Sequence, residues 1–185
     1  MRINWILADA YTPDPTVDLE KLKSIGSFWG GWRTWRACQT DNVICDDLSK
    51  GSELILREFH KTCNLYLPEK QYVALDRPKG VKLYQGKFEQ EVDHADEIIT
   101  MHLAASQSDI LLLLGFDWQP QPKSSDVLTN HRQHVYRNLV KQLIKSNVEV
   151  QWVLVDHPRD LWQDLEGLEN LSLDTLDNVF TTLST

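Results

Sequence analysis

The chain has 185 residues, of which 42% are hydrophobic and 25% are charged, a balance typical of one globular domain with a sizeable core. Its 27 acidic and 19 basic residues give a formal net charge of −8, which argues against a general nucleic-acid or anionic-membrane binder, since those need a basic surface. The three cysteines lack CxxC spacing, and no apolar run approaches the length of a membrane span. We therefore expect residues 1–185 to form a single domain with reduced thiols, in a cytoplasm and without a membrane partner.

The chain opens with a predicted strand over residues 2–8, whose apolar side chains alternate and which ends at Asp9. Two prolines close together then predict a loop. A short helix over residues 17–24 follows, which Thr16 can cap.

The next stretch, residues 27–39, combines a glycine pair with two arginines. Gly30 and Gly31 before a helix start can bring several backbone N–H groups toward an anion, and Arg33 and Arg36 share one face of that helix. The pattern predicts a ligand-binding cradle for a phosphate or another small anion. The alternative is that the glycine pair is only a turn.

The same stretch carries three tryptophans at three-residue spacing: Trp29, Trp32 and Trp35. Such spacing is most often core or interface packing. If the three rings lie on an open surface, they are suited to bind a host or virion protein as a hot spot.

Four further elements are predicted before residue 85, together with a tight turn over residues 76–80, where Pro78 and Gly80 interrupt the pattern. They are a strand over residues 42–45, a helix over residues 49–61, and strands over residues 63–67 and 81–84.

The most informative run is Ile110–Leu114, five apolar residues without alternation, which indicates a strand covered on both faces. Helical periodicity precedes it over residues 92–106 and follows it over residues 126–146. A second apolar run, at residues 150–155, ends the pattern before a last helix over residues 174–183. Strands alternating with helices in this way predict an α/β fold: a three-layer, Rossmann-like domain with a mainly parallel sheet flanked by helices.

Carboxylates end several of the predicted strands: Asp9, Asp46, Asp117 and Asp156. In a parallel sheet wound with helices, the carboxyl ends of the strands meet at one edge, where ligands bind. We expect Asp9, Asp46 and Asp156 to bind the hydroxyl groups of a ligand. We expect Asp117 to be catalytic, and His157, which directly follows Asp156, to transfer a proton. The alternative for each aspartate is a helix cap or a turn. No pattern of a metal site or of a cofactor motif is present, so neither is expected.

Three runs carry a resemblance over the whole chain to small proteins encoded by tailed phages of marine cyanobacteria. They are WGGWRTWRACQTDNVICDD from Trp29, MHLAASQSDILLLLGFDW from Met101 and QWVLVDHP from Gln151. This resemblance implies a viral protein that acts in the host cytoplasm or is associated with the virion. It implies no particular activity.

About half of the chain also resembles the Rossmann-like core of sialyltransferase-type and flagellin-glycosylating enzymes. In those proteins a strand ending in Gly-x-Asp follows an alanine-rich helix, as Gly115-Phe116-Asp117 does here. The glycine-rich nucleotide motif expected after the first strand is absent, and Ala8-Asp9-Ala10-Tyr11 stands in its place. No catalytic residue is carried over from this resemblance.

Two functions follow as hypotheses. The first is a nucleotide, nucleotide sugar or other anionic ligand bound at the carboxyl edge of the sheet, with or without catalysis. The second is a non-catalytic viral structural or host-interaction protein that binds a protein partner through the tryptophan-rich stretch.

Overall fold

The computed structural model describes residues 1–9, 11–85, 95–116, 127–157 and 165–183. All neighbouring strands in this part of the chain pair in parallel within one sheet of order β5-β4-β3-β2-β1-β6-β7-β8. The strands are β1 (Ile3–Leu7), β2 (Ser27–Gly31), β3 (Asn42–Ile44), β4 (Asn64–Pro68), β5 (Lys82–Tyr84), β6 (Ile110–Leu114), β7 (Gln151–Val155) and β8 (Leu171–Asp174). The α-helices are α1 (Leu19–Ile25), α2 (Trp32–Cys38), α3 (Leu48–Leu56), α4 (Glu69–Ala74), α5 (Ala95–Ala105), α6 (Val127–Ser146) and α7 (Leu176–Leu183), with a 3-10 turn η1 (Phe59–Lys61).

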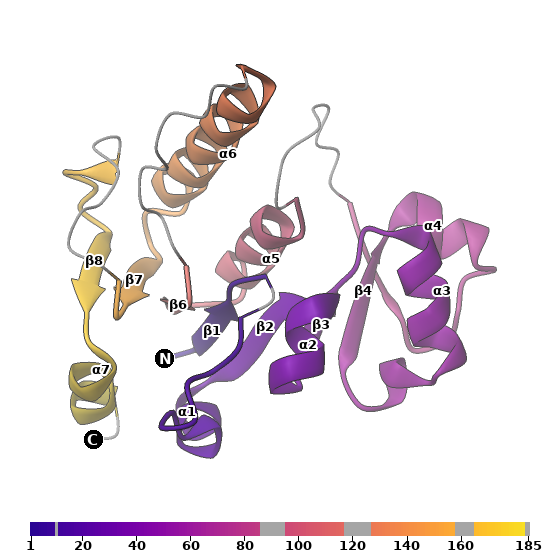
Figure 1. Cartoon of the computed structure of the whole chain (residues 1–185), viewed down its shortest axis with the longest axis horizontal. Helices are drawn as coiled ribbons and strands as arrows, with labels where there is room; N and C mark the ends of the chain where they lie inside the picture. Colours follow the sequence, from indigo (N-terminus) through magenta and orange to yellow (C-terminus); the bar gives the residue numbers. More distant parts are fainter. Residues whose placement is uncertain (10, 86–94, 117–126, 158–164, 184–185) are drawn as a thin grey trace.

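Helices cover both faces of the sheet, so the predicted three-layer α/β, Rossmann-like fold is confirmed. Figure 1 shows α5 and α6 on one side of the sheet and α1, α2 and α7 on the other. None of the described helices combines the length and the apolar character that crossing a bilayer demands.

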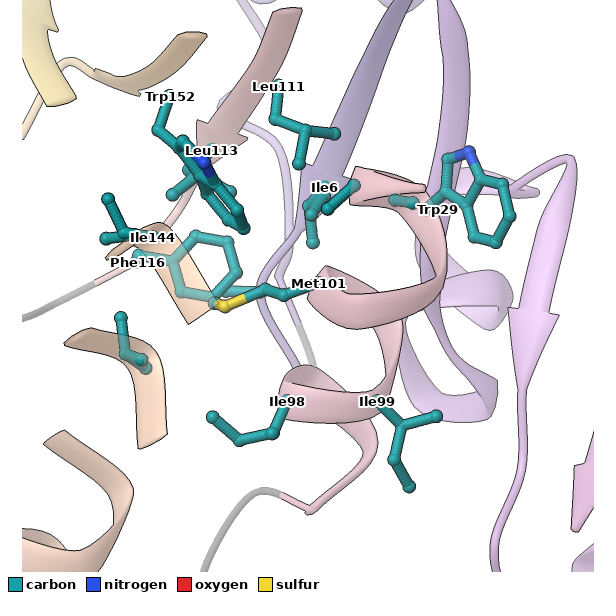
Figure 2. Packing of buried hydrophobic residues seen from close by; sticks show 14 of the residues in the cluster. Ile6, Trp29, Ile98, Ile99, Met101, Leu111, Leu113, Phe116, Ile144 and Trp152 are labelled. Carbon is teal, nitrogen blue, oxygen red and sulfur yellow. The ribbon is translucent and has the colours of Figure 1, made fainter. Parts of the chain in front are cut away.

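Strand β6 lies near the middle of the sheet and confirms the prediction of burial on both faces. Leu111 and Leu113 pack into the cluster beneath α5 and α6, whereas Leu112 and Leu114 pack into the cluster beneath α1 and α7. All four side chains are at most 4% exposed. Figure 2 shows the first of these clusters, in which Leu111 and Leu113 lie with Ile6 of β1 and Met101 of α5. An apolar run without alternation is what such a position requires.

The glycine pair lies in a strand, so the alternative interpretation of it as only a turn is wrong. Gly30 and Gly31 end β2, which pairs with both β1 and β3, and α2 begins at the very next residue. A Cβ on Gly30 would lie 3.0 Å from the Cβ of Thr34, so the missing side chain lets α2 fold back closely on its own strand. The strand was missed because glycines interrupt the apolar pattern.

One further expectation, the cap of the first helix, was wrong, and one strand was not predicted. Helix α1 is capped by Asp18, whose carboxylate accepts hydrogen bonds of 3.1 Å from the backbone N–H groups of Glu20 and Lys21, while Thr16 bonds to Asp14. The chain also adds a last strand, β8, beyond β7. Because β8 is a short edge strand with few buried side chains, its sequence carries little of the strand pattern.

Candidate functional site

The strand order reverses between β1 and β6, and this fixes where a crevice can open. From β1 the chain adds β2 to β5 in one direction, then returns to pair β6 with the other side of β1 and continues to β8. In open parallel sheets, ligands bind outside the carboxyl ends of the strands at such a switch point. Residues Asp9 and Gly115, which follow β1 and β6, flank it here.

Gly115 allows the ring of Tyr11 to lie directly against the end of β6. Its φ is +80°, and a Cβ built on it would overlap the ring of Tyr11. Burial raises the pKa of Tyr11, and the nearby Cys38 and Asp156 act in the same direction, so this phenol stays neutral at physiological pH.

Replacing Gly115 by Ala is therefore expected to lower the free energy of unfolding by about 2 kcal/mol, because the left-handed backbone and the ring contact both disfavour a side chain. Gly167→Ala is the matched control: its φ is +77°, but nothing lies within 4 Å of the added Cβ. Urea unfolding of both variants separates the two contributions. Equal losses in the two variants would mean that the packing of Tyr11 on Gly115 contributes nothing.

Asp9 is held in place by side chains from two helices, α5 and α2. Its backbone N–H donates a 2.7 Å hydrogen bond to Glu97 Oε1 of α5, and its Oδ2 accepts one of 2.8 Å from Arg33 Nη1 of α2. The other oxygen of Glu97, Oε2, accepts a 2.8 Å hydrogen bond from the hydroxyl of Tyr136 in α6. Glu97 thus ties the end of β1 to α6, and Asp9 bridges the helix layers on the two faces of the sheet.

A second carboxylate, Asp96, lies close to Asp9 above the end of β2. A Cβ on Gly31 would lie 3.4 Å from Asp96 Oδ2 and 3.5 Å from Asp9 Oδ1, so the absence of a side chain at Gly31 makes room for both groups. Burial, the neighbouring charge of Asp46 and a hydrogen bond to Asp46 raise the pKa of Asp96 to about 8, with a smaller contribution from Asp9. At neutral pH the Asp96 carboxyl therefore carries a proton.

Of the predicted ligand-binding residues, the structure brings Asp9, Asp46, Gly31 and Arg33 together at this edge. Asp46 is exposed just after β3, and its backbone carbonyl accepts a hydrogen bond from Gln71 of α4. Gly30 and Gly31 both belong to the paired strand β2, and anion binding by their backbone stays a prediction.

Arg36 lies on α2, and its ion pair is with Glu53 of α3, 3.8 Å away, whereas Arg33 pairs with Asp9. Asp117 lies outside the described residues. Asp96 and Glu97 were not predicted, although one signal could have identified them. They fall in the first turn of α5, and the first turn of a helix in such a fold lies at the carboxyl edge.

Asp156 and His157 follow β7, on the far side of β6 from Asp9. Asp156 Oδ1 accepts a 3.1 Å hydrogen bond from the backbone N–H of Leu176, so this carboxylate caps α7, as the alternative interpretation of strand-end aspartates expects. It also lines a cleft of about 470 Å³ between α1 and α7. His157 is half-buried beside it. These two residues are therefore separated from the Asp9 group by the width of β6.

The tryptophan-rich stretch does not form one exposed aromatic surface. Trp29 is 2% exposed and packs on Tyr66 at 5.5 Å between ring centroids, and Trp35 packs on Phe59 at 4.1 Å. Trp32, the first residue of α2, is half-buried and packs against the apolar cluster that includes Leu54 of α3. The three tryptophan rings therefore do not form the open aromatic patch that the predicted protein-binding surface requires.

Among the described residues, no group of three or more histidine, cysteine, aspartate or glutamate side chains is arranged to hold a metal ion. The chain matches no protein-family model, no curated protein and no solved structure.

Proposed function

We propose that this protein binds a small polar ligand, of the nucleotide or nucleotide-sugar class, at the carboxyl edge of its sheet beside the β1–β6 switch point. The observation that carries the proposal is the meeting of Asp9, Asp96 and Arg33 at the place where this fold class binds ligands. Chain segments about 25 to 90 residues apart contribute these three side chains, and their convergence gives the edge both acceptors and a cation.

The carboxyl groups favour a ligand that presents hydroxyl groups. Asp96 Oδ1 is buried, and no hydrogen-bond partner for it exists among the described residues. A buried acceptor without a donor costs about 1–3 kcal/mol, and a sugar or ribose hydroxyl placed there would remove that cost. Asp9, with a side chain 16% exposed and fixed through its other oxygen by Arg33, offers a second acceptor.

The proposal is one of binding rather than of catalysis. Asp117 lies outside the described residues, and His157 follows β7, so β6 separates it from Asp9. Proton transfer by these two residues remains a separate prediction, and binding of the ligand does not require it.

The test is a thermal-shift and calorimetry panel of nucleosides, nucleoside diphosphates and nucleotide sugars on the full chain. A true ligand at 100 times its dissociation constant stabilises the folded state by about 2.7 kcal/mol and so raises the melting temperature. Asp9→Asn is expected to weaken that ligand by about tenfold or more, because a charged acceptor is lost. Glu20→Gln, a carboxylate with a side chain 87% exposed on α1, is the control and should bind as the wild type does.

Two results would contradict the proposal. One is a panel in which no compound raises the melting temperature. The other is a ligand that binds equally well to the wild type and to Asp9→Asn.

A further inference from the structure

Basic side chains gather around the half-buried ring of Trp32, beside the Asp9 group. The guanidinium carbons of Arg33 and Arg36 lie 5.5 Å and 4.9 Å from the indole centroid, and Lys50 Nζ of α3 lies at 5.2 Å. Cations at these distances are attracted to an indole face. The ring therefore collects positive charge from two helices at one place on the surface.

A single carboxylate holds most of this charge together. Glu53 of α3 lies 3.2 Å from Lys50 Nζ, 3.1 Å from Arg57 Nη2 and 3.8 Å from Arg36 Nη2. The hydrogen bond from Lys50, and then the charges of Lys50, Arg57 and Arg36, lower the pKa of Glu53, so it remains ionised. Three cations thus share one carboxylate.

Arg33 completes the group, which we call the Trp32 cluster: Trp32, Arg33, Arg36, Lys50, Glu53 and Arg57. Among the described residues, the four cations of the cluster form ion pairs with two carboxylates, Glu53 and Asp9. These ion pairs therefore contain four positive and two negative charges. The side chains of all three arginines are more than half exposed. Local positive charge of this kind stands out on a chain of net charge −8.

We propose that the Trp32 cluster is the phosphate subsite of the carboxyl-edge site, so that the ligand is a phosphorylated small molecule with at least two phosphate groups. Guanidinium groups match phosphate oxygens with paired hydrogen bonds, and an anion offsets the mutual repulsion of neighbouring cations. Several cations at one place match a diphosphate better than a single carboxylate or monophosphate.

Arg33 connects this subsite to the hydroxyl-binding carboxylates. It contacts Trp32 on one side and donates to Asp9 on the other, so a ligand can place its phosphates over α2 and α3 and its hydroxyl groups on Asp9 and Asp96. This inference rests on the proposed function, which supplies the hydroxyl-binding part of the ligand. It also replaces the glycine-pair cradle as the source of phosphate binding: the donors are side chains of α2 and α3.

The experiment is isothermal titration of the full chain with inorganic pyrophosphate at low and high salt. The double variant Arg36→Gln/Lys50→Gln removes two cations from the cluster and is expected to weaken binding by about tenfold or more. Lys141→Gln/Lys145→Gln removes the same charge from α6 and is expected to change affinity by less than about twofold, since distant surface charges are screened. Melting temperatures of both variants are measured to confirm folding.

The inference is overturned if pyrophosphate does not bind the wild type, or if the two double variants weaken it equally, which would indicate only an effect of net charge. Its failure is distinguishable from failure of the proposed function. If Asp9→Asn weakens the binding of a nucleotide but Arg36→Gln/Lys50→Gln leaves its affinity unchanged, only the phosphate subsite is wrong. If pyrophosphate binding depends on the cluster while no hydroxyl-bearing compound depends on Asp9, the subsite is supported and the proposed function is wrong.

Discussion

Asp96→Asn is expected to stabilise the protein in alkaline solution, although it changes a partly buried residue at the candidate site. The ordinary pKa of an aspartate is 3.8, whereas burial and the neighbouring Asp46 raise the pKa of Asp96 to about 8 in the folded chain. Each pH unit between these values is worth about 1.4 kcal/mol, so full ionisation of this group opposes folding by roughly 6 kcal/mol at most. Asparagine keeps the shape and a donor toward Asp46 but never becomes charged.

The stability of the wild type should fall as the pH rises, because the folded chain binds the Asp96 proton more tightly than the unfolded chain does. Between about pH 4 and pH 8 the unfolded chain has already released the Asp96 proton and the folded chain still binds it, so raising the pH favours unfolding. The stability associated with this group is fully present below about pH 4 and is lost as the pH rises through the folded pKa of about 8. The asparagine variant should lack this dependence, and its advantage over the wild type should grow across that window.

Urea unfolding at about pH 5, 7 and 9 measures the difference. Asp109→Asn is the matched control of opposite sign, because hydrogen bonds from Arg2 lower the pKa of Asp109 in the folded chain. It should destabilise the protein near neutral pH and have little effect in acid. If wild type and Asp96→Asn lose stability in parallel as the pH rises, the buried carboxyl is not the group responsible.

The fold could be predicted from the sequence because a buried strand or helix has an apolar pattern that can be recognised within that one segment of the chain. The run Ile110–Leu114 is apolar throughout, and the structure buries it on both faces. The flanking helices show their periodicity in the same direct way. Two strands, β2 and β8, were not predicted. In β2, Gly30 lacks a side chain so that α2 can approach closely, and in β8 the side chains are largely exposed at the edge of the sheet, so neither segment shows an apolar pattern.

The site could be predicted only in part, since a sequence shows where strands end but not the order in which they pair. All strand-end aspartates were expected to converge, and the parallel sheet does place the described ones on one edge. The order of strands then separates them: Asp9 and Asp46 lie on one side of the switch point, and Asp156 follows β7 on the other. Asp156 is also used as a helix cap, and nothing in the sequence distinguishes a cap from a ligand-binding carboxylate.

The sequence also did not reveal that Lys50 and Glu53 belong to the Trp32 cluster. Their approach to α2 depends on how α3 packs across β3, a tertiary contact that no local pattern encodes. In contrast, the pair Arg33 and Arg36 was found from the sequence, because three-residue spacing on one helix is local information.

Glu97→Ala is expected to destabilise the protein by about 3 kcal/mol or more, the largest loss anticipated from a single polar residue at this edge. Glu97 is 8% exposed, and its carboxylate accepts hydrogen bonds from the Asp9 backbone and from the Tyr136 hydroxyl. Truncation deprives both donors of these acceptors and leaves a void between β1, α5 and α6. Urea unfolding measures the loss, and calorimetry measures its effect on any ligand that depends on Asp9.

Conservative changes separate the two roles of this carboxylate. Glu97→Gln keeps the volume and one carbonyl acceptor for the Asp9 N–H, so it should recover a substantial part of the stability lost in Glu97→Ala. Tyr136→Phe removes only the hydroxyl and should cost about 1 kcal/mol. In a double-mutant cycle, Glu97→Gln and Tyr136→Phe should be less than additive, because each breaks the same hydrogen bond. Strict additivity, together with an alanine variant as stable as the wild type, would show that Glu97 does not tie β1 to α6, and the fixed position of Asp9 would then need another cause.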